Sequence, residues 1–146
     1  MKLDGSVTQV LLVEDNSGDV RLVTEALGEL QDRMELNIVH DGSEAIAFLR
    51  REGAFAQAPH MDLVLLDLNL PRRDGREVLA EMKGDVNLRR TPVIVFSSSN
   101  AQADIAACYD LHANCYVIKP FGLEEFTGTV KSIASFWLGM AILPPR

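Results

Sequence analysis

The stretch from Leu63 to Pro71, with the sequence LVLLDLNLP, constrains the fold of this chain more than any other. Its first four residues are apolar and predict a strand that is buried on both faces, as in a parallel sheet. Pro71 cannot donate a backbone hydrogen bond to a neighbouring strand, so the strand must end before it. Asp67 is therefore expected at the carboxyl end of a buried strand, the edge where open α/β sheets bind ligands.

Strand and helix patterns alternate five times along the chain. Strands that are mostly unbroken apolar runs and that alternate with helices predict an α/β fold, a doubly wound five-stranded parallel sheet covered by five helices. The predicted strands span residues 9–13, 36–39, 62–66, 92–96 and 115–118. The helices are expected to begin near Asn16 or Ser17, at a Ser43 cap, after an Asp74 cap, near Ala101 and near Leu123.

Length and charge limit the possible functions. With 146 residues, 47% of them apolar, the chain predicts one domain, with a core of about residues 8–138 and a C-terminal extension, 139–146. A net charge of −7 argues against a general nucleic-acid or membrane binder. The absence of a signal peptide and of a long apolar run predicts a cytoplasmic protein. Cys108 and Cys115 lack metal-ligand spacing and are expected to be reduced core residues.

Polar side chains follow four of the five predicted strands. Glu14 and Asp15 follow the first, Asp67 the third, Ser97 the fourth and Lys119 the fifth. Because the carboxyl ends of parallel strands meet at one edge of a sheet, we expect these side chains to lie close together. Coincidence would rarely fill each of these positions with a polar residue.

Three close carboxylates repel one another, and a hard divalent cation such as Mg²⁺ relieves that repulsion. A phosphoryl group could then approach Asp67, whose field the cation and Lys119 would neutralise. Asp67 could attack phosphorus and become an aspartyl phosphate. The metal and Lys119 would stabilise the equatorial oxygens during transfer, and Ser97 could donate a hydrogen bond to one of them.

Four segments at characteristic spacing carry a resemblance to a known family: Leu12–Asp15, Leu66–Pro71, Val95–Ser98 and Tyr116–Phe121. Over about residues 8–138 the chain resembles the receiver domain of response regulators, the phosphoryl-accepting half of two-component signalling. The resemblance implies a flavodoxin-like receiver fold with strand order 2-1-3-4-5. It also implies that a histidine kinase donates the phosphoryl group and that a conformational change passes the signal on.

The same resemblance assigns roles to individual residues. It implies that Asp67 is the phosphoacceptor, that Lys119 binds the phosphoryl group, that Ser97 is the switch hydroxyl and that Tyr116 is the switch aromatic residue. It implies Mg²⁺ as cofactor and, in this family, a Lys119–Pro120 bond that is usually cis. The implied metal ligands are Glu14, Asp15, Asp67 and the backbone carbonyl of Asn69.

Two positions depart from the family pattern. Glu14 stands where Asp is common and is one methylene longer, so both direct and water-mediated metal contact remain open. Ser97 stands where Thr is common, which keeps the donor and loses a methyl group. In the implied switch, Ser97 moves toward the phosphoryl group and the Tyr116 ring enters the vacated space. Asn69 and Ser99 would line the route of the attacking water and influence phosphoryl lifetime.

A finer resemblance links the chain to single-domain regulators of bacterial and cyanobacterial phytochromes. It rests on Asp67–Leu79, on the long loop Glu52–His60 and on Ser97–Ser99. It implies a phytochrome-type histidine kinase as partner and, often, a homodimer. Apolar residues between Phe136 and Leu143 continue beyond the length of helix needed to cover the core of one domain. This independently favours a homodimer through the C-terminal helix.

Other functions fit less well. A haloacid-dehalogenase-type phosphatase needs a second acid two residues after the nucleophile, where this chain has Asn69. An FMN-binding flavodoxin would have its phosphate repelled by Glu14 and Asp15. A pseudo-receiver that only binds proteins would usually lack the acceptor, a metal acid or the lysine, and none is missing. We expect no enzyme activity beyond self-catalysed phosphotransfer and autodephosphorylation, and no DNA binding, because only eight residues follow residue 138.

Overall fold

The computed structural model describes residues 1–146 and contains one parallel sheet. Its strand order is β2-β1-β3-β4-β5, which confirms the predicted α/β fold. The β2 strand begins two residues earlier than predicted, because an edge strand tolerates the exposed Glu35. The strands are β1 (Thr8–Val13), β2 (Met34–Val39), β3 (Leu63–Leu66), β4 (Val93–Ser97) and β5 (Cys115–Ile118).

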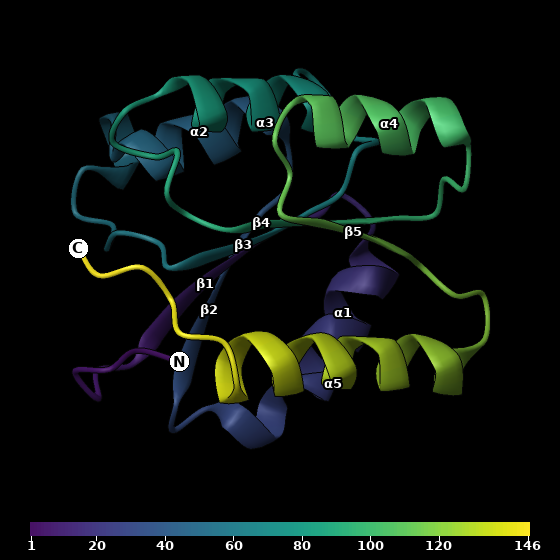
Figure 1. Cartoon of the computed structure of the whole chain (residues 1–146), viewed down its shortest axis with the longest axis horizontal. Coiled ribbons are helices and arrows are strands. Elements are labelled where there is room, and N and C mark those ends of the chain that lie inside the picture. Colours follow the sequence, from purple (N-terminus) through teal and green to yellow (C-terminus); the bar gives the residue numbers. More distant parts are fainter.

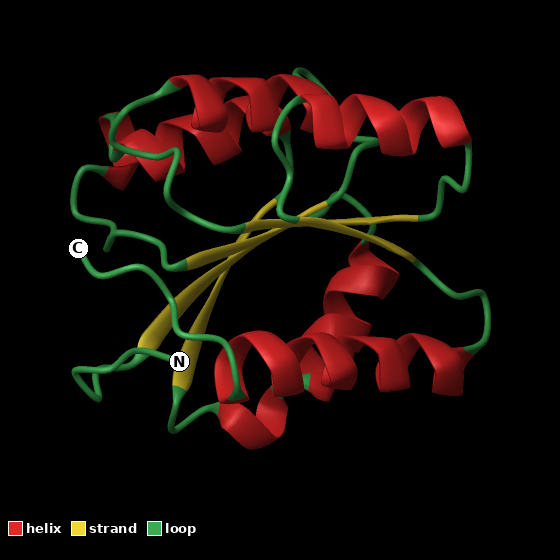
Figure 2. Ribbon diagram, in the orientation of Figure 1, coloured by secondary structure: helices red, strands yellow, loops and turns green.

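Helices cover both faces of the sheet (Figure 1). The secondary-structure view in Figure 2 shows the sheet edge-on between the two helical layers. One layer contains α1 (Ser17–Ala26) and α5 (Leu123–Gly139), and the other contains α2 (Gly42–Arg50), α3 (Gly75–Gly84) and α4 (Gln102–Asp110). Two short 3₁₀ helices, η1 (Gly28–Leu30) and η2 (Gly53–Phe55), lie in the connections that follow α1 and α2.

The central strand β3 contributes to the cores on both sides of the sheet. Val64 and Leu66 pack in the core under α2, α3 and α4, whereas Leu63 and Leu65 pack in the core under α1 and α5. Because successive side chains of a strand point to opposite faces, a strand with two covered faces must be apolar throughout. This explains why the run before Asp67 contains no polar residue.

Strand register brings the ends of the strands to the same level. Val13 pairs with Leu66 across β1 and β3, so the residues that follow them emerge side by side. Ser97 pairs with Ile118 across β4 and β5, which places Lys119 one residue beyond the pair. The carboxyl ends of these four strands therefore form one continuous edge.

Side-chain caps determine where three of the helices begin. Asn16 caps α1 by accepting from the backbone N–H of Asp19 at 2.9 Å, and Asp74 caps α3. The prediction of Ser43 as the cap of α2 is wrong. Asp41 takes that place and accepts from the N–H of Glu44 at 2.7 Å, because its backbone is still extended where the helix starts.

The chain beyond α5 returns to the core. Leu143 is buried beside Phe126 and Val130, and its backbone N–H donates to the carbonyl of Met1 at 2.9 Å. Both cysteines are free, as predicted, and Cys108 is fully buried. The expected cis Lys119–Pro120 bond is wrong, because every peptide bond is trans, the isomer that X-Pro bonds prefer. None of the helices combines the length and apolarity that crossing a bilayer requires.

Candidate functional site

Glu14, Asp67 and Lys119 meet at the carboxyl edge of the sheet. The Lys119 ammonium nitrogen lies 2.5 Å from Glu14 Oε1 and 3.4 Å from Asp67 Oδ2. All three residues are buried, with 2%, 7% and 8% of Glu14, Asp67 and Lys119 exposed. Strand register accounts for the meeting, since each residue directly follows a strand of the same sheet. The positions of these three residues directly after predicted strands had indicated that they would be neighbours.

A fourth charged residue, Asp19, completes the cluster and was not predicted. Its Oδ2 lies 2.9 Å from Lys119 Nζ, so the ammonium group has three carboxylates around it. Asp19 belongs to the first turn of α1 and lies three residues after the cap Asn16. An acid in the first turn of the helix that follows β1 is a signal that could have identified it, because that turn lies nearest to the strand ends.

The backbone around Asp67 is held closely. Its N–H donates to the carbonyl of Val13 at 3.0 Å, and its Oδ1 accepts from the N–H of Leu68 at 2.8 Å. The start of α3 packs directly against this turn, since a Cβ on Gly75 would lie 2.2 Å from the Asp67 carbonyl oxygen. Oδ2 of Asp67 is thus the oxygen that faces Lys119, while Oδ1 is committed to the backbone.

Burial and charge shift the acid–base properties of the cluster. Loss of hydration, reinforced by the nearby charge of Asp67, raises the pKa of Glu14 to about 7, although Lys119 opposes the shift. Burial by itself would lower the pKa of Lys119. Hydrogen bonds to Glu14 and Asp19, with the charges of Asp67 and Glu14, outweigh it and raise that pKa. The ammonium group is therefore charged at neutral pH.

The predicted metal ligands are only partly assembled. Both carboxylate oxygens of Glu14 already accept hydrogen bonds, Oε1 from Lys119 and Oε2 from the N–H of Asn16 at 3.1 Å. Asp15 and Asn69 are exposed, and Asp15 forms no ion pair. Although three carboxylates surround Lys119, no group of three or more carboxylate, imidazole or thiolate side chains is arranged so that it could hold a metal ion. The oxygen-only donors Asp15, Asp67 and the Asn69 carbonyl nevertheless suit the chemistry of Mg²⁺.

The predicted switch residues lie near the cluster without joining it. Ser97 is the last residue of β4 and is fully buried, but its Oγ accepts from the N–H of Ser99 at 3.3 Å and makes no hydrogen bond to Asp67. Tyr116, in β5, packs against the core under α2, α3 and α4. Its hydroxyl donates to the carbonyl of Ser99 at 2.8 Å. The structure thus connects Tyr116 to the loop after β4.

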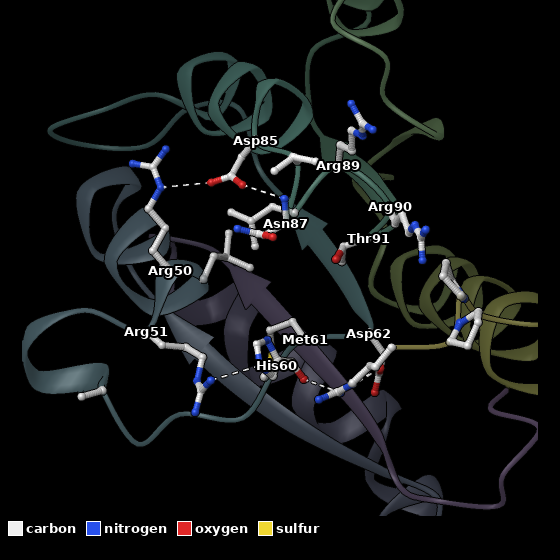
Figure 3. Close-up of a pocket in the computed structure, with 17 residues that line it drawn as sticks. Arg50, Arg51, His60, Met61, Asp62, Asp85, Asn87, Arg89, Arg90 and Thr91 are labelled. Atoms are coloured by element: carbon white, nitrogen blue, oxygen red, sulfur yellow. Dashed lines mark hydrogen bonds and ion pairs between the residues drawn. The ribbon is translucent and has the colours of Figure 1, made fainter.

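A polar hollow of about 810 Å³ lies at the opposite edge of the sheet (Figure 3). Arg146 donates to Asp62, which directly precedes β3, and Arg51 contacts His60. The hollow lies next to the amino ends of β3 and β4, whereas Asp67 lies at the carboxyl end of β3, so the two are separate. Near Lys119 in the sequence, the apolar side chains of Ile118, Phe121 and Leu123 are exposed.

Comparison with known proteins agrees with this geometry. Residues 10–131 match the profile of the response regulator receiver domain. Response regulator Rcp1 of the cyanobacterium Synechocystis sp. is 47% identical over 135 residues, which cover 92% of each chain.

Solved structures extend the similarity to three dimensions. The crystal structure of Mn²⁺-bound Rcp1 has a TM-score of 0.92 and 46% identity, over 94% of this chain and 99% of that one. The phosphorylated cyanobacterial phytochrome response regulator RcpA has a TM-score of 0.93 and 50% identity, over 96% and 100%. The chain belongs to the response regulator receiver family and resembles the phytochrome response regulators within it.

Proposed function

We propose that this protein accepts a phosphoryl group on Asp67 from a histidine kinase and signals by changing conformation. The observation that carries the proposal is the placement of a buried lysine ammonium 3.4 Å from the strand-end carboxylate Asp67. A buried cation at that distance favours charge on oxygens bound to Asp67, which is what phosphoryl transfer requires.

In the proposed reaction, an oxygen of the Asp67 carboxylate forms a bond to phosphorus. The bond between phosphorus and the histidine nitrogen of the kinase breaks, and the imidazole leaves with the electron pair and takes up a proton. Lys119 stabilises the charge on the phosphoryl oxygens. Asp15, Asp67 and the carbonyl of Asn69 would hold Mg²⁺, whose charge offsets the repulsion between the phosphoryl group and the carboxylates.

Glu14 has a separate role in this proposal. Because Lys119 and the backbone of Asn16 occupy both of its oxygens, Glu14 orients Lys119 and would contact a bound metal only through water. This arrangement uses the extra methylene that distinguishes Glu from the Asp common at this position.

Ser97 and Tyr116 are the proposed switch. In this structure Ser97 Oγ accepts from the Ser99 N–H, and phosphorylation would give the Ser97 hydroxyl a charged acceptor to donate to. Such a charge-assisted hydrogen bond is about twice as strong as one between neutral groups. The β4–α4 loop that carries Ser99 then moves, and the face made by α4, β5 and α5 changes with it.

The proposed partner is a phytochrome-type histidine kinase. The similarity to RcpA, a cyanobacterial phytochrome response regulator, supports this choice. Phe121 is fully exposed and Leu123 is largely exposed directly beyond Lys119, which suits docking of another protein beside the acceptor.

We also propose a homodimer through the C-terminal helix. Phe136, Met140 and Ile142 expose large apolar side chains at the end of α5 and just beyond it. A second copy of the chain would cover them. Sedimentation with and without a phosphoryl analogue tests this, and a monomer at tens of micromolar under both conditions would contradict it.

Phosphoryl labelling tests the main proposal. The protein is mixed with Mg²⁺ and acetyl phosphate, and the acyl phosphate is detected by a mass increase that hydroxylamine reverses. Labelling is expected in the wild type and in Asp110→Asn, an exposed control on α4, and is expected to vanish in Asp67→Asn. Labelling that persists in Asp67→Asn would reject Asp67 as acceptor. A wild type that never labels would favour a pseudo-receiver, and steady hydrolysis of an aryl phosphate would favour a phosphatase.

A further inference from the structure

A chain of side-chain hydrogen bonds joins α3, α4 and the loop after β4. The hydroxyl of Ser99 donates to Asp104 Oδ2 at 2.5 Å, and Arg76 donates to Asp104 Oδ1. Asp104 lies in the first turn of α4 and Arg76 in the first turn of α3. Both oxygens of one carboxylate therefore connect the loop to a neighbouring helix.

This connection determines the position of Ser99. Ala101, the first residue before α4, offers no side-chain cap, and its N–H donates instead to Ser99 Oγ at 3.3 Å. On its other side, the N–H of Ser99 donates to Ser97 Oγ at 3.3 Å. The carbonyl that remains on Ser99 accepts from the Tyr116 hydroxyl at 2.8 Å. Whatever holds Ser99 thus also holds the ring of Tyr116.

The other end of the hydrogen-bond chain begins at the turn that carries Asp67. Gly75, directly before Arg76, donates its N–H to the carbonyl of Leu68 at 2.9 Å. A path of contacts therefore runs from the residue after Asp67 through Arg76, Asp104 and Ser99 to Tyr116. The path does not include a hydrogen bond between Ser97 and Asp67. That hydrogen bond is absent, yet the Tyr116 hydroxyl is already bonded to the loop.

We propose that Asp104 is a positioning residue that holds the β4–α4 loop in place before any phosphoryl group arrives. With the loop it holds Tyr116 in the arrangement seen here, called inward, in which the ring packs against the core and the hydroxyl donates to the Ser99 carbonyl. Hydrogen bonds from Ser99 and Arg76 lower the pKa of Asp104, which keeps its carboxylate charged and both bonds charge-assisted. The use of this connection in signalling rests on the proposed function of Asp67, whereas the position of Tyr116 does not.

The experiment follows Tyr116 by ¹⁹F NMR in protein labelled with 3-fluorotyrosine. The chain has two tyrosines, so two resonances are expected, and Tyr109→Phe assigns them. The solvent isotope shift between H₂O and D₂O reports the exposure of each ring. Asp104→Ala should lower the ratio of inward to outward Tyr116 about tenfold, the effect of losing one charge-assisted hydrogen bond. Ser99→Ala should act in the same direction.

Asp110→Ala is the matched control, because it removes an exposed acid from the same helix. It should leave the Tyr116 resonance at its wild-type position. If Asp104→Ala fails to fold, Ser99→Ala, which removes one hydroxyl, decides the outcome. A Tyr116 resonance with wild-type position and isotope shift in the folded variants would overturn the proposal.

These spectra are recorded without Mg²⁺ or phosphodonor, so they do not depend on the chemistry of Asp67. A second set adds Mg²⁺ and beryllium trifluoride, a phosphoryl analogue. In Asp104→Ala the analogue should restore the inward resonance, since Ser97 would then pull the loop directly. A lack of response in both wild type and variant would count against the proposed function of Asp67, while the first set would still decide the role of Asp104.

Discussion

The ammonium nitrogen of Lys119 lies 2.5 Å from Glu14 Oε1, and this buried ion pair joins the ends of β5 and β1. The distance from the same nitrogen to Asp67 Oδ2 is longer, at 3.4 Å. Lys119 is thus held mainly by Glu14 and Asp19 and is available to a new anion on Asp67. Preorganisation of this kind lets the cation act without a large rearrangement when charge appears.

The first prediction concerns pH. Because the pKa of Glu14 is raised from its usual 4.5 to about 7, the folded state binds more protons than the unfolded state between these values. The stability that Glu14 contributes is therefore fully present below pH 4.5 and is lost as pH rises through 7. Without Mg²⁺, the free energy of unfolding of wild type relative to Glu14→Gln should fall by about 1–3 kcal/mol between pH 5 and 8.

Urea denaturation at several pH values measures this difference. Asp67→Asn provides the control, because removing the Asp67 charge takes away one cause of the raised pKa of Glu14. Its pH dependence should be shallower than that of the wild type. Parallel stability curves for wild type and Glu14→Gln would show that Glu14 is charged throughout this range.

The second prediction separates the two acids after β1. Glu14 has both oxygens engaged, whereas Asp15 is exposed and unpaired. Asp15→Asn should weaken Mg²⁺ binding by roughly 100-fold as measured by calorimetry, because the proposed direct ligand is lost and its loss should cost at least as much as that of an outer-shell residue. Glu14→Gln should weaken it less, by roughly 10-fold, the lower end of the range of about 10- to 100-fold that outer-shell residues show. Equal losses would mean that Glu14 binds the metal directly.

Much of the fold and part of the site could be predicted from sequence. The apolar run before Asp67 predicted a strand covered on both faces. The alternation of strands and helices predicted a parallel sheet, in which Glu14, Asp67 and Lys119 lie at the same edge. These predictions depend only on strand periodicity and register, which the order of apolar and polar residues encodes directly.

Other features depend on packing that the sequence does not encode locally. Asp19 reaches Lys119 because of how α1 lies on the sheet, and Arg76 reaches Asp104 because α3 and α4 are neighbours. Nor could the sequence tell that the Ser97 hydroxyl forms its hydrogen bond with Ser99 and none with Asp67. Side-chain partners across elements are decided by distances of a few ångströms between helices far apart in the chain.

The third prediction concerns the contact between α3 and the Asp67 turn. A Cβ on Gly75 would lie 2.2 Å from the Asp67 carbonyl oxygen, so Gly75→Ala must displace backbone. It should lower the free energy of unfolding by about 2–4 kcal/mol and slow phosphoryl labelling. Gly128→Ala, in α5, is the control, because a Cβ added there would have no atom within 4 Å. It should raise the free energy of unfolding by about 0.5–1 kcal/mol. A Gly75→Ala variant as stable as wild type would show that α3 can shift without cost.

The last prediction concerns Lys119. Lys119→Met should leave Glu14 and Asp67 close together without a counter-charge, and removal of one partner from a buried ion pair typically costs about 3–5 kcal/mol. The loss should be greatest at pH 8 and smaller at pH 5, where Glu14 takes up a proton. Asp19→Asn is the matched control, because Lys119 keeps two carboxylate partners and the side chain of Asp19 is a quarter exposed. That variant should lose about 1 kcal/mol or less in the same urea titrations. A Lys119→Met variant whose loss does not change with pH would contradict a pKa of Glu14 that burial, reinforced by the charge of Asp67, raises to about 7.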